Sequence, residues 1–355
     1  MGVIIMNLNE KILYNDFDTI TINSHLNLEC LDNSSILITG ATGLIGSLLV
    51  KYLLYYNYKN DKNIKIITLV RDIKKATEMF ERYLNNKCLT ILQNDIQNTI
   101  SYNKKIDYII HCASITDSKT MYKYPKKTWL TSFIGTKNVL DFAVSKKVKS
   151  FIYISSMEMY GQISSSSKVK ENEIGYIDIL SPRSSYSEGK RACESLNIAY
   201  MIEDNLPVKI IRLSQVFGAG VSYNDTRIYS QFAKSIINHK NIVLNTSGET
   251  VGNYCYTVDA ILGVLFVLLY GENGEAYNVC NEENSMLIKD MASLVVENFG
   301  SGKLEVEIHN DNEQKIYAPI NKMYLSSKKL ESLGWFPSTN LNTMYLRLFQ
   351  YWGYK

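Results

Sequence analysis

Three glycines at three-residue spacing, Gly40, Gly43 and Gly46, stand between a short apolar run and a stretch with helical periodicity. In a strand–turn–helix unit, the first glycine lets the chain turn, the second lets the backbone approach a pyrophosphate, and the third lets helix and strand pack closely. The amino terminus of the following helix then faces the phosphate charge. A tight turn without a ligand is the alternative for the bare pattern, and the position between a strand and a helix counts against it. The residues expected to bind a dinucleotide here are Gly40, Thr42, Gly43, Leu44, Ile45 and Gly46.

From residue 36 onward, short β-branched runs alternate with amphipathic stretches. This alternation is typical of parallel βαβ units, in which helices cover both faces of a sheet. The sequence therefore predicts an α/β protein with a Rossmann-type doubly wound parallel sheet. The predicted strands are 36–39, 65–70, 90–92, 107–111, 150–155 and 208–213, and the predicted helices are 44–56, 73–84, 129–145, 183–202, 228–238 and 288–299.

The rhythm changes after about residue 217, where polar, glycine-containing loops become common. We expect an N-terminal extension over 1–35, which carries no readable motif, followed by a Rossmann NAD(P)-binding domain over 36–217. Residues 218–355 are expected to form most of a smaller mixed α/β substrate-binding lobe. Segments near 254–283 are expected to return to the sheet domain.

The end of the second predicted strand bears on which dinucleotide binds. An acid there favours an unmodified ribose 2′-hydroxyl, whereas an arginine accommodates a 2′-phosphate. Arg71 follows the strand and offers a planar donor fork suited to a phosphate. We therefore expect NADP, with NAD as the alternative, in which Arg71 is solvated and Asp72 binds the ribose.

Tyr186 and Lys190 are four residues apart on a predicted helix, so their side chains point the same way. A phenol has an unperturbed pKa of about 10, and a neighbouring ammonium favours the phenolate. Such a tyrosine can act as an acid or base near neutrality. Isolated pairs of this kind are common on surfaces, but this one follows a strand ending at Ser155 and Ser156.

The chain resembles the extended short-chain dehydrogenase/reductases of the nucleotide-sugar epimerase/dehydratase type. The resemblance covers about residues 36–350, with its motifs in the family's order. The motifs are Thr39–Gly46, His111–Ser114, Ser155–Gly161, Tyr186–Lys190, Arg212–Gly218, Tyr256–Asp259, Tyr277–Val279 and Leu333–Trp335.

The resemblance implies a role for each matched residue. Tyr186 would transfer a proton at a sugar hydroxyl, Lys190 would hold the nicotinamide ribose, and Ser156 would hydrogen-bond the reacting oxygen. The remaining cofactor contacts implied by the family are Asp95 and Ile96 near the adenine, and Ala113 and Ser114 near the ribose and phosphates. The implied substrate contacts are Gln215, which stands where the family usually has Asn, and the loops around Arg227 and Gly248 to Tyr256, which would hold the nucleotide diphosphate.

Several departures from the family bear on the reaction. Met157 and Glu158 stand where a glucose-type 4,6-dehydratase has Asp and Glu, and Met cannot protonate a departing hydroxyl. Glu158 is either a base near C5 or a polar residue that orients the substrate. Gly252 replaces an arginine that many relatives use for the diphosphate, and Ser132 replaces an asparagine.

Three functions follow from these observations. The first is hydride transfer at C4 of a nucleotide-activated sugar, as in epimerases and dehydratases, for the synthesis of surface-polysaccharide precursors. The second is a net NADPH-dependent reduction of a nucleotide-linked keto sugar or ketose to the alcohol or alditol. The third, a non-catalytic dinucleotide-binding scaffold, gives no reason for Ser156, Tyr186 and Lys190 to stand at the family's positions.

Composition excludes other classes of protein and site. The formal net charge of the 355 residues is only +3, with no basic cluster, which argues against a nucleic-acid partner. The longest apolar stretch, Ala260 to Tyr270, is too short to span a bilayer and is predicted to form a buried helix. Six scattered cysteines show neither metal-ligand nor disulfide spacing, so we expect no metal site and a cytoplasmic protein. His111 is expected to be a core residue. By analogy with the family, we expect a homodimer.

Overall fold

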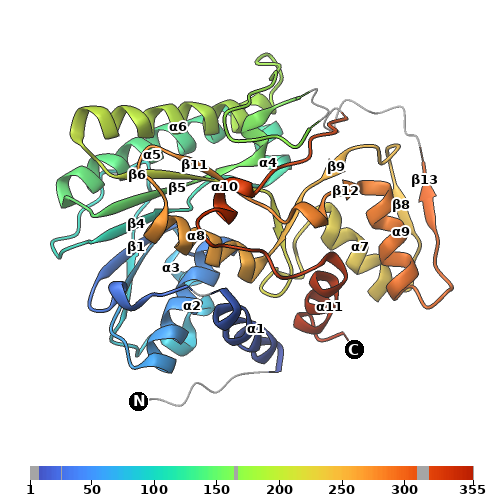
Figure 1. Ribbon diagram of the computed structural model, residues 1–355, viewed down its shortest axis with the longest axis horizontal. Coiled ribbons are helices and arrows are strands. Elements are labelled where there is room, and N and C mark those ends of the chain that lie inside the picture. The colour runs from blue at the N-terminus through green and yellow to red at the C-terminus, as the bar shows by residue number, and fades with distance from the viewer. Residues whose placement is uncertain (1–7, 25, 164–166, 310–319, 355) are drawn as a thin grey trace.

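Seven parallel strands form the centre of the protein in a computed structural model, which describes residues 8–24, 26–163, 167–309 and 320–354 (Figure 1). Their order across the sheet is β11-β6-β5-β4-β1-β2-β3, and every neighbouring pair is parallel. The predicted doubly wound sheet is therefore confirmed. The strands of this sheet are β1 Ser35–Thr39, β2 Lys65–Val70, β3 Leu89–Gln93, β4 Tyr108–His111, β5 Ser150–Ser156, β6 Val208–Leu213 and β11 Ala276–Val279.

Helices cover both faces of the sheet because alternate residues of β1 point in opposite directions. Ile36 and Ile38 are fully buried in a cluster that includes side chains of two helices, α2 and α8. Leu37 is fully buried in the opposite cluster, with side chains of α5 and α6. The α-helices are α1 Leu8–Ser24, α2 Leu44–Asn60, α3 Ile73–Met79, α4 Ser118–Lys123, α5 Pro125–Lys146, α6 Ser184–Asp204, α7 Ile228–Ile237, α8 Thr257–Tyr270, α9 Ile288–Phe299, α10 Lys328–Glu331 and α11 Leu341–Tyr351.

The helix predicted over 73–84 is shorter than expected. α3 ends at Met79, and a 3-10 turn, Glu81–Tyr83, follows it. Phe80 and Tyr83 are both buried, so the chain changes direction to bring both rings inward. The helix predicted from 129 begins earlier, at Pro125, whose fixed φ suits the first position of a helix.

Beyond β6 the chain forms a mixed region of helices and three small two-stranded sheets, seen at the right of Figure 1. Gln215–Phe217 (β7) pairs with Tyr254–Tyr256 (β10), Val251–Gly252 (β9) with Met286–Leu287 (β12), and Ile242–Leu244 (β8) with Val306–Ile308 (β13). The predicted buried helix at Ala260 to Tyr270 is confirmed as part of α8, whose side chains are almost all buried. β11 then rejoins the large sheet beside β6.

An additional helix, α1, precedes the sheet in the segment that shows no motif. Tyr14 and Phe17 of α1 pack against Tyr52 and Tyr55 of α2, with ring centroids 4.9 to 6.0 Å apart. The first seven residues of the predicted extension lie outside the described residues. The tyrosines of α2 therefore form a packing surface for α1.

Candidate active site

The glycine-rich turn connects β1 to α2 with backbone packed against backbone. Gly40 has φ +63°, and a Cβ at this position would lie 2.7 Å from the Cα of Ala113. A Cβ on Gly46 would lie 2.5 Å from the carbonyl oxygen of Gly40. These close approaches require glycine and hold α2 tightly against the sheet.

The same turn leaves room for an anion. Gly43 is the N-cap of α2 and provides no side-chain hydrogen bond to the helix's first amides, so these remain free to bind phosphate oxygens. Just beyond the end of β4, the buried Oγ of Ser114 has no hydrogen-bond partner among the described residues. Free backbone amides and an unpartnered buried hydroxyl are chemically suited to the phosphates and ribose of a dinucleotide.

Arg71 and Asp72, the two residues that follow β2, differ in what their side chains contact. The Asp72 carboxylate accepts the backbone N–H of Lys75 at 3.0 Å and thereby caps α3. The Arg71 side chain is exposed.

Asp95 and Ile96 lie just after β3. Asp95 Oδ1 accepts the backbone N–H of Gln97 at 3.0 Å, and the Ile96 side chain packs closely against Gly135 of α5. Their side chains thus shape the loop at the carboxyl edge of the sheet, where the family's adenine contacts are expected.

The structure brings Ser156, Tyr186 and Lys190 together at the end of β5. Tyr186 and Lys190 lie one turn apart on α6 and are both buried, at 6% and 3% exposure. Ser156 is the last residue of β5 and is hydrogen-bonded to Tyr186. The three residues expected to meet from separate parts of the sequence therefore do so.

The Lys190 ammonium is held by the sheet. Its Nζ donates a hydrogen bond to the carbonyl oxygen of Ile154 at 2.7 Å and lies 4.8 Å from the ring centroid of Tyr153 and 5.8 Å from that of Tyr186. Burial lowers the pKa of Lys190 to about 8. The side chain is therefore mostly charged at neutral pH.

The sequence led us to expect that the Lys190 ammonium favours the phenolate of Tyr186, but other effects on the pKa of Tyr186 are larger in the structure. Burial raises its pKa and the Glu158 carboxylate raises it further, while the hydrogen bond with Ser156 and the charge of Arg227 lower it. Desolvation outweighs the stabilising neighbours, so the phenol keeps its proton in the site as it stands.

Glu158, Arg183 and Arg227 bring charges to the surroundings of Tyr186. Glu158 lies on the 3-10 turn Met157–Tyr160 (η3), and its carboxylate is 3.9 Å from the guanidinium of Arg183. Its side chain is 44% exposed, yet the surrounding protein desolvates it and raises its pKa, with Arg183 acting in the opposite direction. Arg183 immediately precedes α6, and sequence reasoning missed it although it stands three residues before Tyr186.

Arg227, expected at the diphosphate, is placed within electrostatic reach of Tyr186. Its Nε and Nη2 donate to Oδ2 of Asp225 at 2.9 and 2.6 Å, and its guanidinium lies 5.1 Å from the ring centroid of Tyr229. The Arg227 guanidinium is therefore held in one orientation by Asp225. This carboxylate, two residues earlier in the sequence, was the signal that could have indicated the pairing.

The two other expected substrate contacts, Gln215 and Tyr256, have different surroundings in the structure. Gln215 begins β7, is half-buried, and its backbone is bound to Asn253 at 2.9 Å. Tyr256 is 1% exposed, and its hydroxyl donates to Asp16 of α1 at 2.5 Å. The hydroxyl that the motif suggested for substrate is therefore bound by α1 in this structure.

Gly252, where an arginine is common in the family, is filled from a neighbour. A Cβ there would lie 2.2 Å from the Tyr254 hydroxyl, so the Tyr254 side chain occupies the space that a longer residue 252 needs. The packing of Tyr254, on β10, against β9 therefore favours glycine at position 252.

His111 is confirmed as a core residue. It is 1% exposed, and its two ring nitrogens hydrogen-bond Thr39 at 2.7 Å and Thr136 at 3.0 Å. Burial lowers its pKa to about 3, so it is neutral.

The residues that the structure describes include neither a metal-binding cluster nor a membrane-spanning helix. These residues contain no group of three or more His, Cys, Asp or Glu side chains placed to hold a metal ion. None of the helices within them combines the length and the apolarity needed to cross a membrane.

Comparisons with known proteins agree with the geometry. A dTDP-D-glucose 4,6-dehydratase of Dictyostelium discoideum is 29% identical over 256 residues, which is 69% of this chain and 57% of that protein. A UDP-glucuronic acid decarboxylase of Arabidopsis thaliana is 27% identical over 314 residues, covering 88% of this chain and 87% of that protein. This chain spans less than two thirds of the length of the Dictyostelium dehydratase.

Solved structures share the fold. A dTDP-glucose 4,6-dehydratase from Streptomyces venezuelae, with NAD bound, has a TM-score of 0.75 at 21% identity and covers 90% of this chain and 97% of that one. The model of the NAD dependent epimerase/dehydratase family matches residues 36–280. With the glycine-rich turn and the Ser156–Tyr186–Lys190 group in place, the chain belongs to the NAD dependent epimerase/dehydratase family.

Proposed function

We propose that this protein is an NAD(P)-dependent oxidoreductase that acts on a nucleotide-activated sugar by hydride transfer at C4. The observation that carries the proposal is the convergence of Ser156, Tyr186 and Lys190 at the carboxyl edge of the sheet, beside the glycine-rich turn. Ligands of open α/β sheets bind at this edge. The resemblance to dehydratases and decarboxylases of nucleotide sugars supports the substrate class.

The residues of the chain divide the chemistry between them. A nicotinamide dinucleotide, when bound, would supply the hydride acceptor or donor. Tyr186 takes or gives the proton of the C4 oxygen, Ser156 hydrogen-bonds that oxygen, and Lys190 contributes a positive charge that favours the phenolate when the proton leaves. The dinucleotide is held by the amides at the start of α2, by Ser114 and by Lys190.

A net reductase is the second candidate, and the resting state of Tyr186 favours it. Because the phenol is protonated as the site stands, it is ready to donate a proton to the oxygen of a keto sugar that accepts a hydride. A sugar oxidation has to begin with the opposite ionisation of the same group.

The fate of the 4-keto sugar depends on Glu158. Its raised pKa suits a group that takes a proton from C5, and Arg183 lies close enough to hold the carboxylate in place. Met157 offers no acid for a departing hydroxyl, which disfavours the glucose-type dehydration.

We propose NADP as the preferred cofactor. Arg71 is exposed at the end of β2, whereas Asp72, the alternative ribose contact, is already used to cap α3. The Streptomyces neighbour binds NAD, so the preference rests on this pair of residues alone.

A panel of nucleotide sugars, each incubated with NAD or NADP in both redox states, tests the function by mass spectrometry. Loss of water identifies a dehydratase, gain of two hydrogens a reductase, loss of carbon dioxide a decarboxylase, and an unchanged mass with a new isomer an epimerase. A panel in which no sugar and no cofactor changes contradicts the proposal. The product is expected to supply surface-polysaccharide synthesis in the cytoplasm, where the free cysteines are stable.

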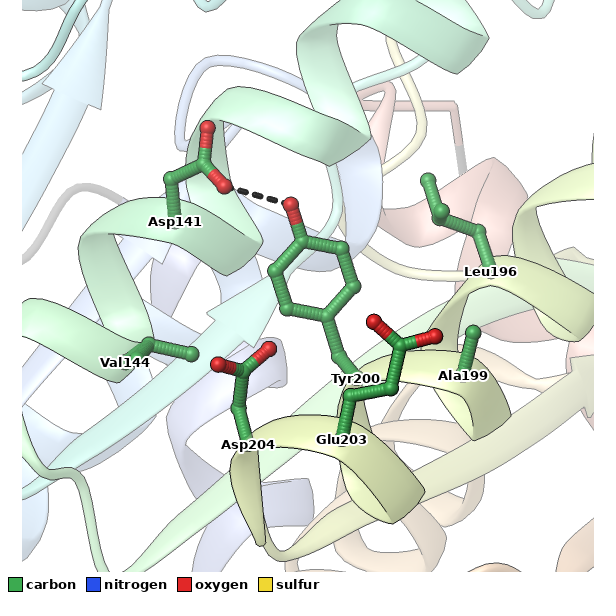
Figure 2. A pocket seen from close by; sticks show the side chains of 7 residues that line it. All are labelled: Asp141, Val144, Leu196, Ala199, Tyr200, Glu203 and Asp204. Atoms are coloured by element: carbon green, nitrogen blue, oxygen red, sulfur yellow. Dashed lines mark hydrogen bonds between the residues drawn. The ribbon is translucent and has the colours of Figure 1, made fainter.

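We propose that two copies pair through α5 and α6. Leu130, Ile134 and Ile202 expose 45%, 37% and 70% of their surface on these helices. The far end of the helix pair is acidic: Figure 2 shows Asp141, Glu203 and Asp204 around Tyr200, whose hydroxyl is hydrogen-bonded to Asp141. Lys126 and Lys127 begin α5. A two-fold pairing with antiparallel helices brings these lysines toward the partner's acidic end.

A further inference from the structure

A buried carboxylate, Glu194, continues the row of catalytic side chains along α6. Tyr186, Lys190 and Glu194 are spaced by four residues, so they lie on the same face of the helix. Glu194 is 7% exposed, and the function proposed above gives it no part. Because a buried charge is costly unless it is paired, its partners have to be identified.

The Glu194 carboxylate receives hydrogen bonds from two other elements. Ser155 Oγ donates to Oε1 at 2.5 Å. Arg212 donates Nη2 to Oε2 at 2.7 Å and shares its Nε between the two oxygens at 3.1 and 3.2 Å. Both side chains of the ion pair are only 8% exposed. A forked, nearly dry pair of this kind fixes orientation as well as distance.

This pair joins the elements that carry the reacting groups. Ser155 directly precedes Ser156 on β5. Arg212, on β6, donates its third nitrogen, Nη1, to the hydroxyl of Tyr160 at 2.9 Å. Tyr160 ends the 3-10 turn that carries Glu158. One carboxylate on α6 therefore reaches the strand that ends in Ser156 and the turn that follows it.

Glu194 also contributes a negative charge that raises the pKa of the Lys190 ammonium. The groups facing Lys190 are His111 and Cys112 from the end of β4, Tyr153 from β5, and Tyr186, Cys193 and Glu194 from α6. Of these groups, Glu194 is the only carboxylate. On its other side Glu194 faces the cation of Arg212, whose charge it balances.

Glu194 and Arg212 border a cavity of about 430 Å³, which is lined by residues such as Met159 and Arg191 but not by Tyr186 or Ser156. Glu194 thus acts on the reaction only through its neighbours.

We propose that Glu194 is a positioning residue: through Ser155 and Arg212 it holds Tyr186 and Lys190 in register with Ser156 and Glu158, and it keeps a negative charge beside the Lys190 ammonium. The proposal rests on the proposed function, which assigns the roles of Tyr186 and Lys190.

The test follows the ionisation of Lys190 by NMR in protein carrying ¹³C-labelled lysine, without cofactor or substrate. Burial lowers the pKa of two lysines, Lys190 and Lys209, to about 8. Their signals should therefore titrate before those of exposed lysines. Lys190→Met and Lys209→Met assign the two signals, and Lys209 then serves as the internal reference.

In Glu194→Gln, the titration midpoint of Lys190 should fall by about one pH unit or more, while that of Lys209 stays unchanged. Glu194→Asp, which keeps the charge, should restore most of the shift. If Glu194→Gln folds poorly, the double variant Glu194→Leu with Arg212→Met removes the pair without leaving an unpaired charge. Its Lys190 midpoint should fall in the same direction but by less, because the Arg212 cation is removed together with the carboxylate.

Asp107→Asn is the matched control. Asp107 is a second buried carboxylate with hydrogen-bond partners on another strand, but it precedes β4 at the opposite edge of the sheet. It should lower stability without moving the Lys190 midpoint. A Lys190 midpoint that stays in place in Glu194→Gln and in the double variant overturns the proposal and leaves Glu194 a purely structural residue. Failure of the proposed function appears separately, as turnover retained by Tyr186→Phe, because the lysine titration needs no substrate.

Discussion

Alanine at Gly46 places a methyl group against the backbone of the glycine-rich turn. The new Cβ would lie 2.5 Å from the Gly40 carbonyl oxygen and 2.8 Å from the Cα of Ala41. Neither atom moves easily, because the Gly40 oxygen accepts the Gly43 N–H at 2.9 Å and Ala41 is buried. Overpacking of this kind costs about 1 to 3 kcal/mol. We therefore expect Gly46→Ala to lower the free energy of unfolding by this amount even without a cofactor.

Gly43 offers a substitution of the same chemistry with a different expected effect. Its φ of −84° and ψ of 172° are open to alanine, and the Cβ would meet only the Gly40 oxygen, at 3.2 Å. Stability should fall by less than about 1 kcal/mol, a value below the overpacking range. The methyl group stands where the pyrophosphate approaches, so dinucleotide affinity should fall at least tenfold, or about 1.4 kcal/mol.

Urea unfolding of the cofactor-free variants measures the first effect, and calorimetric titration with NADPH and NADH measures the second. If Gly43→Ala binds both dinucleotides as tightly as the parent, the turn is not the site at which the pyrophosphate binds. If Gly46→Ala is as stable as the parent, the close contact between residue 46 and the Gly40 carbonyl oxygen is not present in the protein.

Three further perturbations test other parts of the account. Arg71→Ala should weaken NADPH binding at least tenfold and NADH binding little, and an equal loss for both in the same titration contradicts the 2′-phosphate contact. Burial raises the pKa of Asp107, but hydrogen bonds from Lys105 and Ser35 outweigh it and lower the pKa to about 2, against an ordinary value of 3.8. This carboxylate should therefore contribute about 2 kcal/mol above pH 4 that is lost as the pH falls toward 2, so the stability cost of Asp107→Asn should shrink over that range in urea unfolding. If two copies pair through α5 and α6 as proposed, Leu130→Glu should halve the mass measured by light scattering, and an unchanged mass contradicts the proposed interface.

The sheet was predictable because its signals are local. β2 and α9 have the predicted bounds, since β2 is a short run rich in apolar and β-branched residues and α9 is an amphipathic run with helical periodicity. The grouping of Ser156, Tyr186 and Lys190 was also predictable, because Tyr186 and Lys190 share a helix face and Ser156 ends the neighbouring strand.

The contacts between distant segments were not predictable. α1 has little amphipathic pattern, and its place depends on partners such as Tyr256 and Arg347, which lie far along the chain. The surroundings of Tyr256 were hidden for the same reason: a motif gives a residue's order in the chain, whereas the hydrogen bond to Asp16 determines where its hydroxyl points, and its contact with substrate stays a prediction. For the ion pair between Glu194 and Arg212 the sequence contains one signal: Glu194 follows Lys190 by four residues and therefore lies on the same helix face.

The central claim is that Tyr186 moves the proton at the sugar oxygen, and Tyr186→Phe tests it most directly. The variant and the parent are compared on the substrate that the mass-spectrometric panel identifies, with dinucleotide affinity measured on the same samples. Product formation should fall at least a thousandfold, within the range of about 10² to 10⁴ that general acid–base catalysis supplies. Cofactor affinity should change less than about threefold. Product formed at the parent's rate by a variant that binds its cofactor normally contradicts the central claim.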